Sequence, residues 1–119
     1  MASFSVSEYC TEIEGREIMK SNTMIKRILT APVYDVARET PIDPMPFLSK
    51  HLHNNIQVKR EDLQPAFSFK LRGAYTCMVR LSPEQKQKGV VAASAGNHAQ
   101  GVAIAAAKLG IASTIFMPV

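Results

Sequence analysis

Cysteine and long apolar runs are scarce in this sequence, and each scarcity excludes a class of protein. Two cysteines among 119 residues, Cys10 and Cys77, cannot form a disulfide framework, so we expect reduced thiols. The longest apolar run in the helical part, 102–107, is far too short to span a bilayer. The chain does not open with a basic stretch followed by an apolar one, as a secretory signal would. We therefore expect a cytoplasmic protein with no membrane segment.

Massed charge and clustered glycines are also missing. The formal net charge is +4, but Lys and Arg are scattered and no aromatic residues interleave with them, so nucleic-acid binding is not expected. The six glycines never cluster, which excludes a dinucleotide fingerprint and a Walker-type phosphate loop. His51, His53 and His98 have no partners at metal-ligand spacing, so we expect no metal site.

The apolar pattern becomes regular after Asn55. It predicts strands at 56–58, 90–93 and 111–119 and helices at 69–79 and 97–109, with a shorter helix between the cap Ser82 and Gly89. This order is typical of an α/β fold with a parallel sheet and crossover helices. The last strand is apolar and no element follows to cover it. We therefore expect an amino-terminal fragment of a larger α/β protein.

The first part of the chain is organised differently. We expect residues 1–45 to form an N-terminal segment with short helices, and 46–119 to form a second domain that the chain covers only in part. Helical periodicity is modest from Glu8 to Leu29, and four prolines between 32 and 46 exclude a long helix there. A short helix is expected from about Pro46 to His53, with Asp43 as a candidate cap.

Two loops follow strands at the edge where open α/β sheets bind ligands. The first loop ends in Lys70, which is flanked by Phe67, Phe69 and Leu71. We expect these apolar side chains to shield the Lys70 amine from water, and Arg72 to add a nearby positive charge. Both effects favour the neutral amine that Schiff-base chemistry requires. A solvated surface lysine is the alternative.

The second loop contains Ser94, Ala95 and Gly96 and leads directly into the helix that begins with Asn97 and His98. The first amides of a helix have no partners within it, and they attract an anion such as a carboxylate or a phosphate. Gly96 allows the backbone to approach a ligand closely. The Asn97 amide can hydrogen-bond a ring hydroxyl or phenolate; the alternative is that it only caps the helix.

The two loops together resemble a known family. The segments KREDLQPAFSFKLRGAY (59–75) and ASAGNHAQGVA (93–103) are similar to those of biosynthetic threonine dehydratases, within a resemblance from about Ile28 to Val119. These are pyridoxal-phosphate enzymes of the tryptophan-synthase-β fold, also called fold type II. The resemblance implies that 46–119 is part of a catalytic domain. It also implies that the full-length protein eliminates water and ammonia from L-threonine to give 2-oxobutanoate, in isoleucine biosynthesis.

The resemblance also implies roles for single residues. Lys70 would form the imine with pyridoxal phosphate and remove the α-proton, Phe69 would pack beside the cofactor, and Asn97 would hydrogen-bond its ring oxygen. The carboxylate of the substrate would be held by Ser94, Ala95, Gly96, Asn97 and His98. The phosphate-binding loop and the partner of the pyridine nitrogen would lie beyond residue 119. We therefore expect the fragment to bind the cofactor poorly and to have no turnover, and the full-length protein to form a tetramer or dimer.

Other functions share these motifs. A catabolic threonine/serine dehydratase or a serine racemase carries both loops, so L-serine is an alternative substrate. A non-catalytic α/β binding module that kept the fold is a second alternative, and it predicts no imine at Lys70. A truncated gene product without a function of its own is a third.

Overall fold

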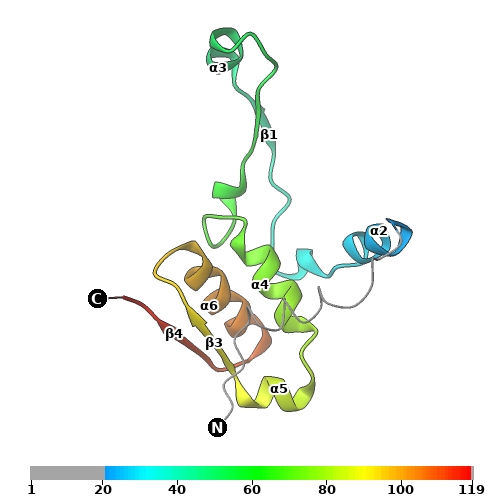
Figure 1. The fold of residues 1–119 in the computed structure, drawn as a ribbon, viewed down its shortest axis with the longest axis vertical. Coiled ribbons are helices and arrows are strands. Elements are labelled where there is room, and N and C mark those ends of the chain that lie inside the picture. Colours follow the sequence, from blue (N-terminus) through cyan, green and yellow to red (C-terminus); the bar gives the residue numbers. More distant parts are fainter. Residues whose placement is uncertain (1–20, 119) are drawn as a thin grey trace.

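The computed structural model describes residues 21–118, which extend over 56 × 42 × 25 Å (Figure 1). The described helices are α2 (Ser21–Leu29), α3 (Pro46–His51), α4 (Lys70–Val79), α5 (Pro83–Lys88) and α6 (Asn97–Leu109), with 3-10 turns η1 (Val33–Asp35) and η2 (Glu61–Leu63). The strands are β1 (Ile42–Pro44), β2 (Gln57–Lys59), β3 (Val90–Ala93) and β4 (Ser113–Phe116). Of the helical periodicity expected from Glu8 to Leu29, the part before Ser21 lies outside the described residues, as does Cys10.

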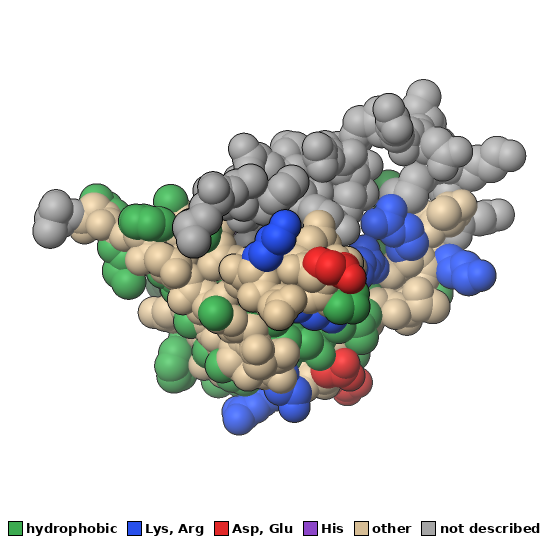
Figure 2. Space-filling model, turned by 90° about the horizontal axis from the view of Figure 1, so that it is seen from below, with side chains coloured by type: hydrophobic (Ala, Val, Ile, Leu, Met, Phe, Trp, Pro, Cys, Tyr) green, Lys and Arg blue, Asp and Glu red, His purple; other side chains and the backbone are tan. Residues whose placement is uncertain are grey.

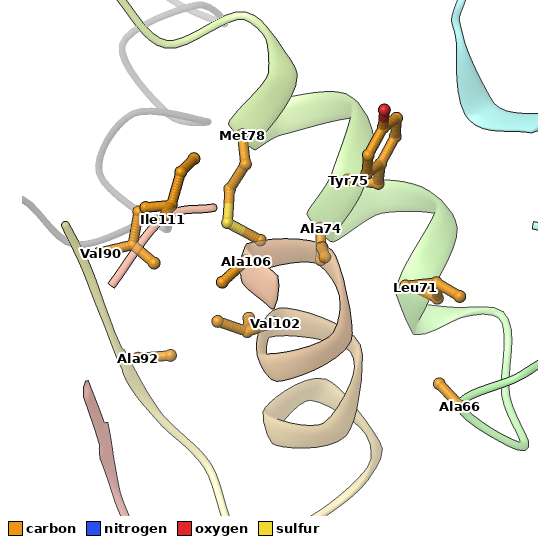
Figure 3. Packing of buried hydrophobic residues seen from close by; sticks show 11 residues of the cluster. Ala66, Leu71, Ala74, Tyr75, Met78, Val90, Ala92, Val102, Ala106 and Ile111 are labelled. Carbon is orange, nitrogen blue, oxygen red and sulfur yellow. The ribbon is translucent and has the colours of Figure 1, made fainter. Parts of the chain in front are cut away.

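The body of the molecule is a three-layer arrangement with α6 in the middle. Strands β3 and β4 pair in parallel, from Val90 opposite Ser113 to Ala93 opposite Phe116, and α6 is the crossover between them. Helix α6 packs between this sheet and α4 (Figures 1 and 3). The core is formed by Ala66, Leu71, Ala74, Tyr75, Met78, Val90, Ala92, Val102, Ala105, Ala106 and Ile111. The predicted parallel sheet with a crossover helix is therefore confirmed.

Helix α4 buries the side that its sequence predicts. Its buried residues are Leu71, Ala74, Tyr75 and Met78, which repeat at the three- and four-residue spacing of one helix face. In Figure 3 these side chains lie on the side of α4 that faces α6. The hydroxyl of Tyr75 donates to Asp35 at 3.1 Å, and this hydrogen bond ties η1 to the helix.

The ends of α5 and α6 also follow their sequence signals. The backbone N–H of Gln85 donates to Ser82 Oγ at 3.2 Å, and the backbone N–H of Ser82 donates to Gln85 Oε1 at 2.8 Å. These two bonds form the predicted capping box. Helix α5 ends at Gly89 with φ 82°, and α6 ends at Gly110 with φ 67°. Both are left-handed conformations that glycine adopts without a steric penalty.

Residues 42–59, which we call the arm, differ from the prediction. Strand β2 does not join the parallel sheet as expected; it pairs antiparallel with β1, from Ile42 opposite Lys59 to Pro44 opposite Gln57. Helix α3 lies between the two strands and forms the tip of the arm, which projects away from the body (Figure 1). A three-residue strand that ends in proline carries no alternating pattern, so β1 had no signal in the sequence.

Two smaller predictions in this region and at the last strand were also wrong. Asp43 does not cap α3, because Met45 occupies the N-cap position without a side-chain hydrogen bond. The Asp43 carboxylate instead accepts a hydrogen bond from Arg60 at 2.7 Å, so the attraction of a full positive charge prevails over the cap. Strand β4 is shorter than the predicted 111–119, and its Phe116 is 62 % exposed.

The surface and the helix lengths bear on the expected partners. On the face seen in Figure 2, basic side chains stand in small separate groups with acidic ones among them. No helix within residues 21–118 has the length and apolar character needed to cross a membrane.

Candidate functional site

Lys70 is the first residue of α4, and its side chain is exposed. The Lys70 Nζ atom lies 5.2 Å from the centre of the Phe69 ring. Phe67 is 77 % exposed and Phe69 is 59 % exposed, whereas Leu71 is fully buried. The expected apolar shield around the amine is therefore not formed within this chain. Phe67 and Phe69 flank Ser68, which is turned inward, so their rings face the solvent.

The loop before Lys70 is held in one shape by a buried glutamine. Gln64 is 1 % exposed, its Oε1 accepts from the backbone N–H of Arg38 at 2.8 Å, and its Nε2 donates to the Arg38 carbonyl at 2.8 Å. The Gln64 carbonyl accepts from the backbone N–H of Phe67 at 2.8 Å. This turn places Phe67 at φ 51°, a left-handed conformation that costs about 1–2 kcal/mol outside glycine. The sequence analysis missed Gln64, because a single polar residue in a polar stretch has no pattern.

A charged group below this loop accounts for Arg72. Glu61 accepts a hydrogen bond from Thr40 at 2.7 Å and from Gln64 at 3.2 Å, and its carboxylate lies 3.8 Å from the Arg72 guanidinium. Burial alone would raise the pKa of Glu61, but these hydrogen bonds and the charge of Arg72 outweigh burial and lower it. Arg72 also lies 5.3 Å from the ring centre of Tyr34. Arg72 is thus engaged with Glu61 and Tyr34, whereas the sequence analysis expected it to act on Lys70.

The second loop connects the sheet to α6. The backbone N–H of Ser94 donates to the carbonyl of Phe116 at 2.9 Å, so β4 holds the start of this loop. Gly96 occupies the N-cap position of α6 with no side-chain cap, and its N–H donates to Ser94 Oγ at 3.3 Å. Asn97 is the first residue of the helix and is exposed, so the alternative that it caps α6 is wrong. The amides of the first turn are therefore available to an anion.

Close packing of α4 on α6 brings the two loops to the same end of the helix pair (Figures 1 and 3). Gly101 is buried at this contact, and a Cβ atom placed on it would lie 3.0 Å from the backbone nitrogen of Leu71 and from the carbonyl carbon of Lys70. Asn97 lies four residues before Gly101, on the same face of α6 and one turn nearer to its start. The structure thus brings Asn97 and the first turn of α6 to the side of Lys70.

The groups at this end fit pyridoxal phosphate. Lys70 offers an exposed amine for an aldehyde, Asn97 offers an exposed amide for a ring oxygen, and the uncapped start of α6 offers N–H donors for an anion. Ser68 Oγ adds a buried hydroxyl with no hydrogen-bond partner in the described part of the chain. Such an orphaned group is rare and is often found where a ligand binds.

Known proteins share both the sequence and the fold. The pattern of the family described as pyridoxal-phosphate dependent enzyme matches residues 33–119. The chain is 50 % identical, over 115 residues and 97 % of its length, to the chloroplastic biosynthetic threonine dehydratase of Arabidopsis thaliana. It is 56 % identical, over 105 residues and 88 % of its length, to the biosynthetic L-threonine dehydratase of Escherichia coli K12. The chain spans 19 % of the length of each of these relatives.

Two solved structures agree with this relationship. The processed form of threonine deaminase isoform 2 from Solanum lycopersicum superimposes with a TM-score of 0.75 at 50 % identity, over 84 % of this chain and 28 % of that one. Maize serine racemase superimposes with a TM-score of 0.72 at 36 % identity, over 77 % of this chain and 28 % of that one. The expected fold, a part of a fold type II enzyme, and the resemblance to biosynthetic threonine dehydratases are confirmed. Since the family pattern also covers most of its length, the chain belongs to the pyridoxal-phosphate dependent enzymes.

Proposed function

We propose that this chain is part of a threonine dehydratase, which converts L-threonine to 2-oxobutanoate and ammonia in isoleucine biosynthesis. One observation carries the proposal: Lys70 and the loop 94–98 meet at one end of the α4–α6 pair, where Gly101 contacts the Lys70 backbone. The relatives named for this activity support it, at 50 % and 56 % identity.

Lys70 would hold the cofactor and move a proton. When bound, pyridoxal phosphate supplies an aldehyde that takes up an amine and a ring that accepts electrons. Lys70 Nζ would carry the cofactor at rest, and once substrate has displaced it would take the proton from the substrate Cα at the same atom. Phe69 would pack beside the ring, and the Asn97 amide would donate to its oxygen.

The loop 94–98 would orient the substrate. The uncapped amides at the start of α6, together with the hydroxyl of Ser94, would bind the carboxylate, and Ala95 and Gly96 leave the backbone open to it. His98, the second residue of α6, is half-buried and would close one side of this loop. A carboxylate fixed there keeps the substrate Cα from rotating away from Lys70.

The exposed position of Lys70 bears on how the complete protein works. A neutral amine is the form that reacts with an aldehyde, and removal from water favours it. We infer that Lys70 becomes covered in the complete protein, either by the cofactor or by segments outside these 119 residues. The division of the chain at residue 45 into an N-terminal segment and a partial catalytic domain remains part of this proposal.

The test uses the complete gene product with pyridoxal phosphate. L-threonine should give 2-oxobutanoate, and Lys70→Ala should abolish the reaction. Borohydride followed by peptide mapping should attach the pyridoxyl group to Lys70. A label on another lysine, or none, would favour the non-catalytic binding module. Faster turnover of L-serine than of L-threonine would indicate the catabolic dehydratase.

Serine racemase is a second candidate, favoured by the fold match to the maize enzyme at 36 % identity. The tomato threonine deaminase matches at a higher identity, 50 %, which favours the dehydratase. Chiral analysis of the products from L-serine separates the two, because a racemase gives D-serine and the dehydratase gives a 2-oxo acid with ammonia.

Assembly and location also belong to the proposal. We infer a dimer or tetramer of the complete protein, which size measurement in solution would test. A cytoplasmic location was expected from the sequence, but the Arabidopsis thaliana relative is named chloroplastic. Microscopy of the tagged complete protein would decide between the two.

A further inference from the structure

We propose that Gly101 is a positioning residue, which sets how closely the loop 94–98 approaches Lys70. The inference rests on the proposed function, because it concerns the geometry of the same site. Gly101 lies outside that loop and is not expected to touch a ligand. It acts through the backbone of Lys70, against which it packs.

The contact at Gly101 has no room for a methyl group. An added Cβ would lie 3.0 Å from Leu71 N, 3.0 Å from the Lys70 carbonyl carbon and 3.2 Å from the Lys70 carbonyl oxygen. Ordinary contacts between carbon atoms are about 3.5–4.0 Å. All three neighbours are backbone atoms, so no side-chain rotation can relieve the overlap. Alanine at this position must therefore move α6 away from the first turn of α4, by roughly half an ångström.

Such a shift reaches the loop because α6 moves as one body. The helix is packed on both sides, and its Val102 and Ala105 are fully buried. Asn97 stands one turn from Gly101 on the same face, so a displacement at Gly101 separates Asn97 from Lys70. The start of the loop stays with the sheet, since Ser94 N–H is bonded to the carbonyl of Phe116 at 2.9 Å. The spacing between amine and loop would therefore change, and relaxation of the loop would not restore it.

Gly73 provides the matched control within the same helix pair. It lies on α4, is exposed, and a Cβ atom placed on it meets nothing within 4 Å in the structure. Gly73→Ala makes the same chemical change at a helical glycine three residues from Lys70. It should leave the spacing between the two helices as it is.

The experiment titrates the complete gene product with pyridoxal phosphate. The Lys70 nitrogen adds to the aldehyde carbon with loss of water, borohydride delivers a hydride to that carbon, and peptide mapping measures the fraction labelled. Misplacement by 1 Å can cost about 100-fold, so about half that displacement should weaken half-saturation about tenfold in Gly101→Ala. Gly73→Ala should label as the wild type does.

A second control separates position from stability. Val102→Ala removes buried volume from α6 without touching the Gly101 contact, so it should lower the melting temperature and leave the labelling midpoint unchanged. If Gly101→Ala does not fold, Ala105→Val takes its place. It adds bulk on the same face one turn farther from the loop, and we expect a smaller weakening in the same direction.

The outcomes distinguish this inference from the proposed function. If wild-type protein is labelled at Lys70 and the folded Gly101→Ala and Ala105→Val variants have the same midpoint, Gly101 has no positioning role. If Val102→Ala weakens labelling as much as Gly101→Ala does, general stability explains the effect and the inference is likewise overturned. If wild-type protein is not labelled at Lys70, the proposed function fails and takes this inference with it.

Discussion

Replacement of Gln64 by leucine tests whether the loop that leads to Lys70 is held by hydrogen bonds. Gln64→Leu keeps nearly the same side-chain volume in a position that is 1 % exposed, so the change removes polar interactions without leaving a large cavity. Leucine cannot form the two hydrogen bonds that Gln64 makes with the backbone of Arg38, at 2.8 Å each, or the one with the carboxylate of Glu61 at 3.2 Å.

The expected cost follows from these three hydrogen bonds. A neutral hydrogen bond contributes about 0.5–1.5 kcal/mol, and one to a charged group about 1.5–3 kcal/mol. Arg38 is exposed, so water can satisfy part of the hydrogen-bonding capacity that its backbone would have left open. We therefore expect Gln64→Leu to lower the free energy of unfolding by about 2–4 kcal/mol.

Urea unfolding followed by circular dichroism measures this change, with Gln57→Leu as the control. Gln57 is exposed on β2, and its replacement should change the free energy of unfolding by less than about 0.5 kcal/mol. A Gln64→Leu variant as stable as the control would refute the reasoning. A destabilised variant whose Lys70 still labels with the wild-type midpoint would show that the turn stabilises the fold without positioning the amine.

Three further predictions use the same structure. Ser68→Ala removes a buried hydroxyl that has no partner among residues 21–118, so thermal unfolding without cofactor should show unchanged or slightly higher stability, by up to about 1 kcal/mol, while the melting-temperature increase caused by pyridoxal phosphate should shrink. The pKa of Glu61 is lowered by folding, so its contribution is complete above its unfolded pKa of about 4.5 and is lost as the pH falls below that value; urea titrations at pH 7 and pH 3 should show a smaller loss for Glu61→Gln than for wild type. The 119-residue chain alone should give no 2-oxobutanoate from L-threonine in the presence of pyridoxal phosphate, and turnover by it would show that no further segment is needed.

The sequence predicted best where one periodic signal decides the structure. Helix α4 buries Leu71, Ala74, Tyr75 and Met78 because their spacing leaves no other face for the core. The ends at Ser82 and Gly110 were predictable because a cap and a left-handed glycine are local features that need no distant partner.

The failures share the opposite cause, since each depended on a partner far along the chain. Strand β2 was correctly expected near 56–58, but its pairing with β1 depends on a three-residue segment with no alternating pattern. Asp43 suits a helix cap in local terms, but it lies close to Arg60, 17 positions later. Local rules cannot weigh such a competition.

The candidate site was predicted in composition but not in environment. Lys70 and the loop 94–98 were identified from residue types, and the structure places both at one end of the α4–α6 pair. Whether those residues perform the predicted chemistry remains a prediction. The exposure of Phe67 and Phe69 was missed because sequence alone does not tell which residues of an irregular loop turn inward.

The contact between α4 and α6 also has a kinetic meaning. Lys70 and Asn97 are separated by fewer than thirty positions, and closing a loop of that length costs little entropy compared with joining the ends of a long chain. Helices so near in sequence can therefore dock early in folding, before distant segments have found their places. A nascent chain would then have both halves of this constellation in register as soon as the second helix has been synthesised.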